Sequence, residues 1–280
     1  MLKTTRLAPA KINLCLHVLG KRADGYHELA MLMQRVSLYD RVAVELTAQP
    51  GARVHCEGVA LAPGEQNIAG RAATMMLDLA ASGGGVDLVI EKNIPVAAGL
   101  GGGSSDAAAV LMALNEMLGL GLSRTRLMEL GVRLGADVPF FIFEEAAWAT
   151  GIGERLEKVS GLPSVWYVLV NPGFSVSTAQ VYQKLGLTSP GDVARLPRFP
   201  GTLRDLVGQL HNDLERVTLA DFTVVAKIKE MLVALGAEGT LMSGSGPTVF
   251  GIFATEAAAR TAEAKLLKVA GWKVFTVQPV

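Results

Sequence analysis

A glycine-rich segment between an apolar strand and a helix constrains this chain most strongly. The strand begins near Val86, the helix is expected over 107–118, and the loop between them contains Gly99, Gly101, Gly102 and Gly103. Because glycine lacks a β-carbon, the backbone N–H groups of such a loop can approach an anion closely. Ser104, Ser105 and Asp106 suit a helix start, where unpaired N–H groups carry partial positive charge. The segment therefore predicts a cradle for a polyphosphate.

Neither of the two common phosphate-binding motifs accounts for this loop. A P-loop places a lysine after its glycines, and none follows here, while a dinucleotide fold needs a further glycine where the chain has Ser104. An ordinary strand-to-helix turn would explain one or two glycines. Four glycines and a serine pair beside a helix favour a binding site.

The composition limits the classes of protein to which this chain can belong. Half of the 280 residues are hydrophobic, which indicates a globular chain long enough for two domains. The formal net charge is zero, which argues against a nucleic-acid partner held by phosphate contacts. The two cysteines and four scattered histidines show no spacing typical of a zinc site or a disulfide framework. Neither a secretory signal nor a membrane span is recognisable, so we expect a cytoplasmic protein.

The N-terminal segment 4–20 alternates between apolar and polar residues, which is typical of a half-buried strand. Lys11 and Asn13 lie on the face opposite the apolar set, where a lysine is usually solvated. A turn at Asp24-Gly25 follows, and then Tyr26 and His27. Such a pair is usually a packed aromatic beside a surface imidazole, but it also suits a nucleobase, which a phenol can stack on and an imidazole can hydrogen-bond.

Two polar residues stand at ends of predicted elements. Asp137 lies in a glycine- and proline-flanked turn, GADVPF, before a segment expected to be an apolar strand. From the residues alone, an Asx-turn or a helix cap explains Asp137 as well as a catalytic role does. Asn67 begins a helix expected over 67–81 and could be a simple N-cap.

The composition changes over 151–163, which we interpret as a domain junction. Beyond it the patterns predict strands at 166–170, 239–242, 248–253 and 272–277, and helices at 178–185, 203–210, 222–235 and 256–269. This order is βαββαβ with extra helices, and it predicts a ferredoxin-like domain. A Gly-Ser turn between the middle strands, SGSGP at 243–247, is by itself a typical β-turn.

Four segments together resemble the GHMP kinases, a family named for galactokinase, homoserine kinase, mevalonate kinase and phosphomevalonate kinase. They are PAKINL at 9–14, PVAAGLGGGSSDA at 95–107, GADVPF at 135–140 and LMSGSGPT at 241–248. The resemblance implies an α+β two-domain GHMP kinase fold, with a ribosomal-protein-S5-domain-2-like domain over 1–158 and a ferredoxin-like domain over 159–280. It also implies ATP and Mg²⁺ as cofactors and an active site in the cleft between the domains.

The resemblance implies a role for each matching residue. Asp137 would accept the proton of a substrate hydroxyl or orient that hydroxyl, and Lys11 would offset negative charge on the transferred phosphoryl group. ATP would be bound by Asn67, Pro95, Gly99, Leu100, Gly101, Gly102, Gly103, Ser104, Ser105 and Asp106. The magnesium ligands stay open, with Ser105 as one candidate.

The string RADGYHEL at 22–29 resembles one branch of the family, whose substrate carries a cytidine diphosphate group and which serves the non-mevalonate route to isoprenoid precursors. It implies phosphorylation of the 2-hydroxyl of that substrate. The substrate contacts would be Asn13, Tyr26, His27, Thr178 and Tyr182. A homoserine or mevalonate type of kinase and a non-catalytic nucleotide-binding member are the alternatives. A monomer and a homodimer both stay open.

Overall fold

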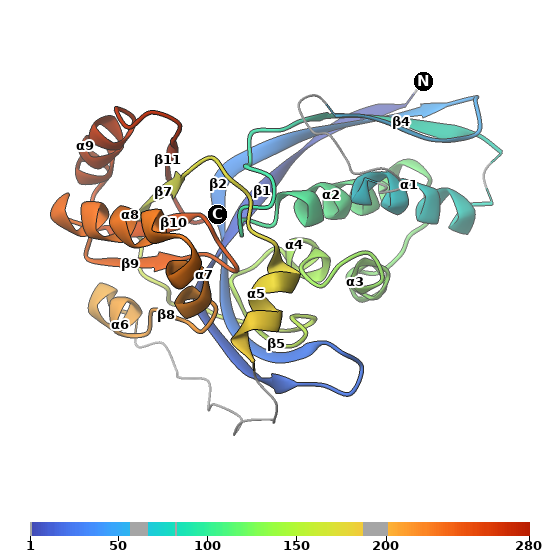
Figure 1. Ribbon diagram of the computed structural model, residues 1–280. Helices are drawn as coiled ribbons and strands as arrows, with labels where there is room; N and C mark the ends of the chain where they lie inside the picture. Colours follow the sequence, from blue (N-terminus) through green and yellow to red (C-terminus); the bar gives the residue numbers. More distant parts are fainter. Residues whose placement is uncertain (1, 57–66, 82, 187–200) are drawn as a thin grey trace. The chain divides into compact units, whose positions relative to one another are not determined.

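The computed structural model describes residues 2–56, 67–81, 83–186 and 201–280 (Figure 1). Its contacts divide the chain into two compact units, each built from several segments. Unit 1 comprises Met1–Ala10, Leu38–Val96 and Gly101–Glu144, and unit 2 comprises Lys11–Ser37, Ala97–Leu100 and Glu145–Val280. The boundary expected at residue 158 stays a prediction, as does a cleft between domains. None of the described helices is long and apolar enough to cross a membrane.

Unit 1 is a sheet covered by helices. Its strands are the first part of β1 (Lys3–Lys21), the second part of β2 (His27–Thr47), β3 (Gly51–Cys56) and β4 (Gly85–Glu91). β4 runs antiparallel to β2 and parallel to β3. The helices are α1 (Ile68–Leu79), α2 (Gly102–Met117), α3 (Arg124–Val132) and α4 (Val138–Phe143). α1 and α2 pack side by side, and α1 also contacts β3 and β4 (Figure 1).

Helix α2 begins at Gly102, earlier than the expected start near Ala107. Gly101 precedes it in a left-handed conformation, with φ 71°, which glycine adopts at little cost. The N–H of Ser105 then donates to the carbonyl of Gly101 at 3.0 Å and closes the first turn. The serine pair and Asp106 consequently lie inside the first turns of the helix, not ahead of it.

The segment after Asp137 is the short helix α4, so the predicted strand there is wrong. A run of apolar residues with no polar spacing cannot be distinguished from a buried helix by periodicity. Pro139 stands in the first turn of α4, where its fixed φ suits a helix and its missing N–H costs no hydrogen bond. The loop that carries Asp137 thus leads into a helix start.

Unit 2 contains the predicted ferredoxin-like arrangement. Its strands are β7 (Trp166–Asn171), β9 (Gly239–Met242), β10 (Val249–Phe253) and β11 (Lys273–Val277). The sheet order β11-β7-β10-β9 is antiparallel throughout and places the first and third of these strands at the centre. Helix α8 (Thr223–Ala234) packs on β9 and β10, and α9 (Glu256–Leu266) packs on β7 and β11. Tyr167 and Phe250 meet edge to face in the core, with ring centroids 5.8 Å apart.

The rest of unit 2 surrounds the other parts of β1 and β2. It consists of β5 (Ala147–Gly151), β6 (Arg155–Lys158), β8 (His211–Asn212), α5 (Thr178–Leu185), α6 (Leu203–Gly208) and α7 (Glu215–Asp221). β5 pairs with β2 and with β6, and β8 runs parallel to β1. The strands β5, β6 and β8 and the helix α7 were not predicted. β8 has only two residues, too few to show a period.

Candidate active site

The first part of the glycine loop, in unit 2, is held by β1 and by the turn after β9. The N–H of Lys11 donates to the carbonyl of Leu100 at 2.9 Å, and Ser243 Oγ donates to the carbonyl of Gly99 at 2.9 Å. Gly99 has φ +79°, and a β-carbon there would lie only 2.0 Å from the carbonyl oxygen of Ser243. Only glycine fits this close approach, through which the Gly-Ser turn contacts the loop.

Lys11 and Asn13 are buried in β1, although the strand pattern alone predicted a solvated face. Their exposed fractions are 4% and 1%, because the strand is buried on both faces from Ala10 to Leu16. Lys11 Nζ donates to Asn13 Oδ1 at 2.7 Å, and the N–H of Asn13 donates to Ser243 Oγ at 3.3 Å. The lysine side chain is thus oriented before any ligand binds.

The second part of the loop, in unit 1, forms the start of α2. Ser105 and Asp106 are 1% and 3% exposed, and Pro95 is half-buried in the connection from β4. Among the described residues, neither Ser105 Oγ nor Asp106 Oδ1 has a hydrogen-bond partner. Buried polar atoms are normally satisfied, so these two oxygens indicate a ligand at the helix start.

A buried ion network that sequence reasoning missed holds this helix start. Lys92 Nζ bonds to Asp40 Oδ2 and, at 2.7 Å, to Asp106 Oδ2. Asp40 Oδ1 also accepts from the N–H groups of Asn93 and Ile94, at 2.6 and 2.8 Å. The network therefore ties the end of β4 to the N-terminal part of α2. Its signal in the sequence was the two-residue period that places Asp40 on the buried face of β2 with Leu38 and Val42.

Burial and charge oppose each other within this network. Burial raises the pKa of Asp106 to about 7, although the charge of Lys92 acts to lower it. Burial likewise acts to lower the pKa of Lys92, but Asp106 and Asp40 outweigh burial and raise it. One ammonium thus lies between two carboxyl groups, and burial disfavours the ionised form of Asp106.

Asn67 and Asp137 lie on segments of unit 1 that converge on the start of α2. Ile68 Cγ2 lies 3.5 Å from the place of a β-carbon on Gly103, and Ile68 Cδ1 lies 3.3 Å from the place of one on Gly135. Asn67 Oδ1 accepts from the N–H of Ala69 at 2.9 Å, so the predicted N-cap is confirmed, and its adenine contact stays a prediction. Within the part of the chain that is described, the Asp137 carboxylate makes no capping bond to α4, which excludes the helix-cap interpretation.

The side chains expected to contact substrate all belong to unit 2. His27 and Tyr182 stack with ring centroids 4.7 Å apart and planes inclined by 26°. Thr178 Oγ1 lies 2.8 Å from Ser245 Oγ, in the same turn as Ser243. The ring of Tyr26 is available to a ligand, because that residue is 57% exposed. The fold thus brings together aromatic residues that are far apart in the sequence.

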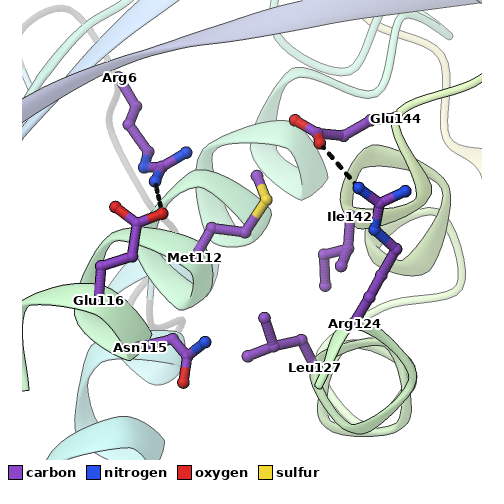
Figure 2. Close-up of a pocket in the computed structure, with 8 residues that line it drawn as sticks. All are labelled: Arg6, Met112, Asn115, Glu116, Arg124, Leu127, Ile142 and Glu144. Atoms are coloured by element: carbon purple, nitrogen blue, oxygen red, sulfur yellow. Dashed lines mark hydrogen bonds and ion pairs between the residues drawn. The ribbon is translucent and has the colours of Figure 1, made fainter. Parts of the chain in front are cut away.

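Figure 2 shows a cavity of about 210 Å³ in unit 1 that is separate from these residues. It is lined by Arg6, Met112, Asn115, Glu116, Arg124, Leu127, Ile142 and Glu144. Two ion pairs, Arg6–Glu116 and Arg124–Glu144, cross its rim. None of the predicted site residues lines it, so this cavity is not the candidate active site.

Comparison with known proteins gives the class to which this fold and site belong. The model of the GHMP kinases N-terminal domain matches residues 67–145, and that of the GHMP kinases C-terminal domain matches residues 197–270. Together with the full-length relatives below, these matches show that the chain belongs to the GHMP kinase family.

The full-length relatives point to one kind of enzyme within the GHMP kinase family. The 4-diphosphocytidyl-2-C-methyl-D-erythritol kinase of Syntrophotalea carbinolica is 62% identical over 98% of both chains. The enzyme of the same name from Geobacter sp. strain M21 is 55% identical over the whole of both. A crystal structure of a 4-(cytidine 5'-diphospho)-2C-methyl-D-erythritol kinase matches with a TM-score of 0.80 and 39% identity, over 98% of this chain and 99% of the other.

Proposed function

We propose that this chain transfers the γ-phosphoryl group of ATP to the 2-hydroxyl of 4-diphosphocytidyl-2-C-methyl-D-erythritol, in the non-mevalonate route to isoprenoid precursors. The observation that carries the proposal is full-length identity of 50–62% to eight relatives that are named for this kinase. Homoserine and mevalonate kinases match at only 12–21% identity and share the fold alone. A cytoplasmic location belongs to the same proposal.

The glycine loop binds the phosphates of ATP in this reaction. The first N–H groups of α2 have no partner within the helix, and the helix dipole favours an anion beside them. Gly99 and Gly101 both have positive φ, which lets neighbouring N–H groups turn toward one anion. Asn67, at the start of α1, contacts the adenine.

Mg²⁺ accompanies ATP, and Ser105 is the residue that would hold it. Mg²⁺ prefers oxygen ligands and is usually bound through few protein oxygens together with substrate phosphates. The buried Ser105 Oγ, which has no hydrogen-bond partner among the described residues, fits such a role. When bound, the ion neutralises negative charge on the phosphates.

Lys11 and Asp137 act on the reacting groups. Lys11, oriented by Asn13, donates to the transferred phosphoryl group and offsets its negative charge. Asp137 orients the 2-hydroxyl and accepts its proton as the new O–P bond forms and the bond to ADP breaks. In a loose transition state the proton leaves late, so orientation is the larger part of this role.

Asp137→Asn tests this assignment of roles. We expect turnover to fall by about 10²–10⁴-fold, because the amide can neither accept the proton nor hold the hydroxyl in the same way. ATP affinity, measured by equilibrium binding, should stay close to that of the unchanged protein. Asp78→Asn, on the exposed side of α1, is the matched control. Near-normal turnover of Asp137→Asn would refute the role.

Recognition of the base rests on Tyr26, His27 and Tyr182. Tyrosine rings offer a π-face to cytosine, and the imidazole of His27 offers a hydrogen bond to its polar edge. Burial and the charge of Lys21 lower the pKa of His27, so the imidazole is neutral near pH 7 and keeps one donor and one acceptor. Thr178 and Asn13 contact the remainder of the substrate.

Release of ADP with the cytidyl substrate, homoserine and mevalonate in parallel tests the substrate assignment. We expect turnover with the cytidyl compound only, and a raised KM for it in Tyr182→Ala and Tyr26→Ala. Val233→Ala removes a similarly exposed apolar side chain from α8 and should leave KM unchanged. Turnover of another alcohol would overturn the substrate, and an unchanged KM in both tyrosine variants would overturn the stacking role.

A further inference from the structure

The strands β1 and β8 and the turn after β8 bring three potential metal ligands of unit 2 together. β8 runs parallel to β1 with Cys15 opposite His211 and Leu16 opposite Asn212. Side chains two residues apart on a strand share a face, so His17 projects on the side of Cys15. Asp213 follows β8 directly, in the turn that leads to α7. One ligand atom from each of His17, His211 and Asp213 lies within 4.8 Å of the others. We propose that these three residues bind a first-row divalent transition metal ion such as Zn²⁺.

The carboxylate of Asp213 is already oriented for this role. The N–H of Val18 donates to Asp213 Oδ2 at 2.8 Å, which leaves Oδ1 directed at His211 Nε2, also at 2.8 Å. Backbone donors that fix a ligand in this way are a regular feature of metal sites. A metal ion would replace the hydrogen that these two atoms now share.

The imidazole of His17 lies beside that of His211. Their rings stack with centroids 4.4 Å apart and planes inclined by 19°. In a tetrahedral site with bonds of about 2.0–2.2 Å, ligand atoms lie about 3.5 Å apart, so the rings must rotate slightly to converge. The side chain of His211 is 47% exposed, which permits that rotation and leaves water to complete the coordination.

The chemistry of the three ligands selects the class of ion. Two imidazoles and one carboxylate suit Zn²⁺, Co²⁺ and Ni²⁺, whereas Mg²⁺ and Ca²⁺ prefer oxygen ligands alone. A hydrogen-bonded His-Asp pair alone would need only His211 and Asp213, and would leave the second imidazole unexplained.

The site connects to the glycine loop through Asn212, which lies between two of its ligands. Asn212 Nδ2 donates to the carbonyls of Met242 and Gly244, both at 2.8 Å, and so holds the turn that contacts Gly99. A metal ion bound to both β8 and β1 should therefore also stabilise the position of Asn212 and of the turn that Asn212 holds. We expect metal binding to raise the melting temperature of the protein.

Titration of the whole protein, stripped of metal with a chelator, tests the site. Zn²⁺ is added without nucleotide, and binding is followed by calorimetry, with a parallel thermal scan. The variant His17→Gln/His211→Gln removes both imidazoles. The matched control is His55→Gln/Cys56→Ser, which removes an adjacent histidine and cysteine from β3 in unit 1. Added Co²⁺ gives a separate readout, because its visible absorption reports the ligand set.

We expect one Zn²⁺ per chain, a rise in melting temperature, and a Co²⁺ spectrum with nitrogen and oxygen ligands. In His17→Gln/His211→Gln, affinity should fall at least about tenfold and the thermal shift should vanish, while the control keeps both. Circular dichroism and the metal-free melting temperature verify that each variant is folded. Equal Zn²⁺ affinity in His17→Gln/His211→Gln, or loss of binding in the control variant, would overturn the proposal.

Discussion

The two parts of the glycine loop are held by different chemistry. At Gly99 and Leu100, in unit 2, neutral hydrogen bonds and a backbone approach too close for a β-carbon fix the loop. At the start of α2, in unit 1, a lysine between two buried carboxyl groups does so. Neutral hydrogen bonds respond little to pH. Buried charges, in contrast, titrate with pH and are costly to leave without a partner. The two parts should therefore fail under different perturbations.

Removing the cation should have the largest effect on stability. Lys92→Met leaves Asp40 and Asp106 buried without a cation, and we expect a loss of about 3–5 kcal/mol in the free energy of unfolding near pH 8. Urea unfolding measures it. Lys184→Met, which breaks an exposed pair with Asp221, should cost at most about 1 kcal/mol. If both variants lose the same small free energy of unfolding, the buried ion network contributes no more to stability than an exposed ion pair does.

Adding a side chain to the neutral part of the loop should have the next largest effect on stability. Gly99→Ala adds a β-carbon 2.0 Å from the Ser243 carbonyl at positive φ, so we expect a loss of about 2–4 kcal/mol and a raised KM for ATP. Gly25 also has positive φ, but nothing lies within 4 Å of its β-carbon position. Gly25→Ala should therefore cost only about 1–2 kcal/mol and leave the KM unchanged. Equal costs would show that backbone strain, not contact, dominates.

Loss of a hydroxyl at the neutral part should have a smaller effect. Ser243→Ala removes the donor to Gly99 and the acceptor for Asn13, and we expect a loss of about 1–3 kcal/mol that varies little from pH 5 to pH 8. Thermal unfolding across this range measures it. A loss that changes strongly with pH would contradict the neutral description of this part.

The pH dependence of stability sharpens the contrast between the two parts of the loop. Burial raises the pKa of Asp106 to about 7 in the folded protein, whereas in the unfolded chain the carboxyl has its ordinary pKa of 3.8. Between these values the folded state binds more protons, so the contribution of Asp106 to stability falls as pH rises. Asp106→Asn should lack this fall. The difference in unfolding free energy between Asp106→Asn and the unchanged protein, from pH 4 to pH 8, tests the sign.

The sequence predicted the elements whose side chains follow a clear period. The four strands of the ferredoxin-like sheet and helices such as α8 and α9 lie close to their expected bounds, because alternation and helical spacing reflect one buried face. Helix α4 was mistaken for a strand, since Val138–Phe143 is apolar throughout. The strand pattern alone placed Lys11 on a solvated face, since the contacts of β1 with Leu100 and Ser243 leave no mark on its local pattern.

The candidate site was predictable where its chemistry lies in contiguous motifs. The loop, Lys11 and Asp137 each stand in a segment that resembles a motif of the GHMP kinases, and the roles of Lys11 and Asp137 are what that resemblance implies. The network of Lys92, Asp40 and Asp106 and the cluster of His17, His211 and Asp213 do not, because strand pairing assembles them from distant segments. Of these, only Asp40 carried a local signal, as a carboxylate on the buried face of a strand.

The stacked rings of His27 and Tyr182 bear on selectivity. The imidazole of His27 covers one face of the Tyr182 ring. Under the proposed function, a cytosine that stacks on this face would have to displace the imidazole, and its own flat ring would replace the stacking that is lost. A small aliphatic alcohol has no ring to stack, so the resting pair would favour a ligand that carries a base.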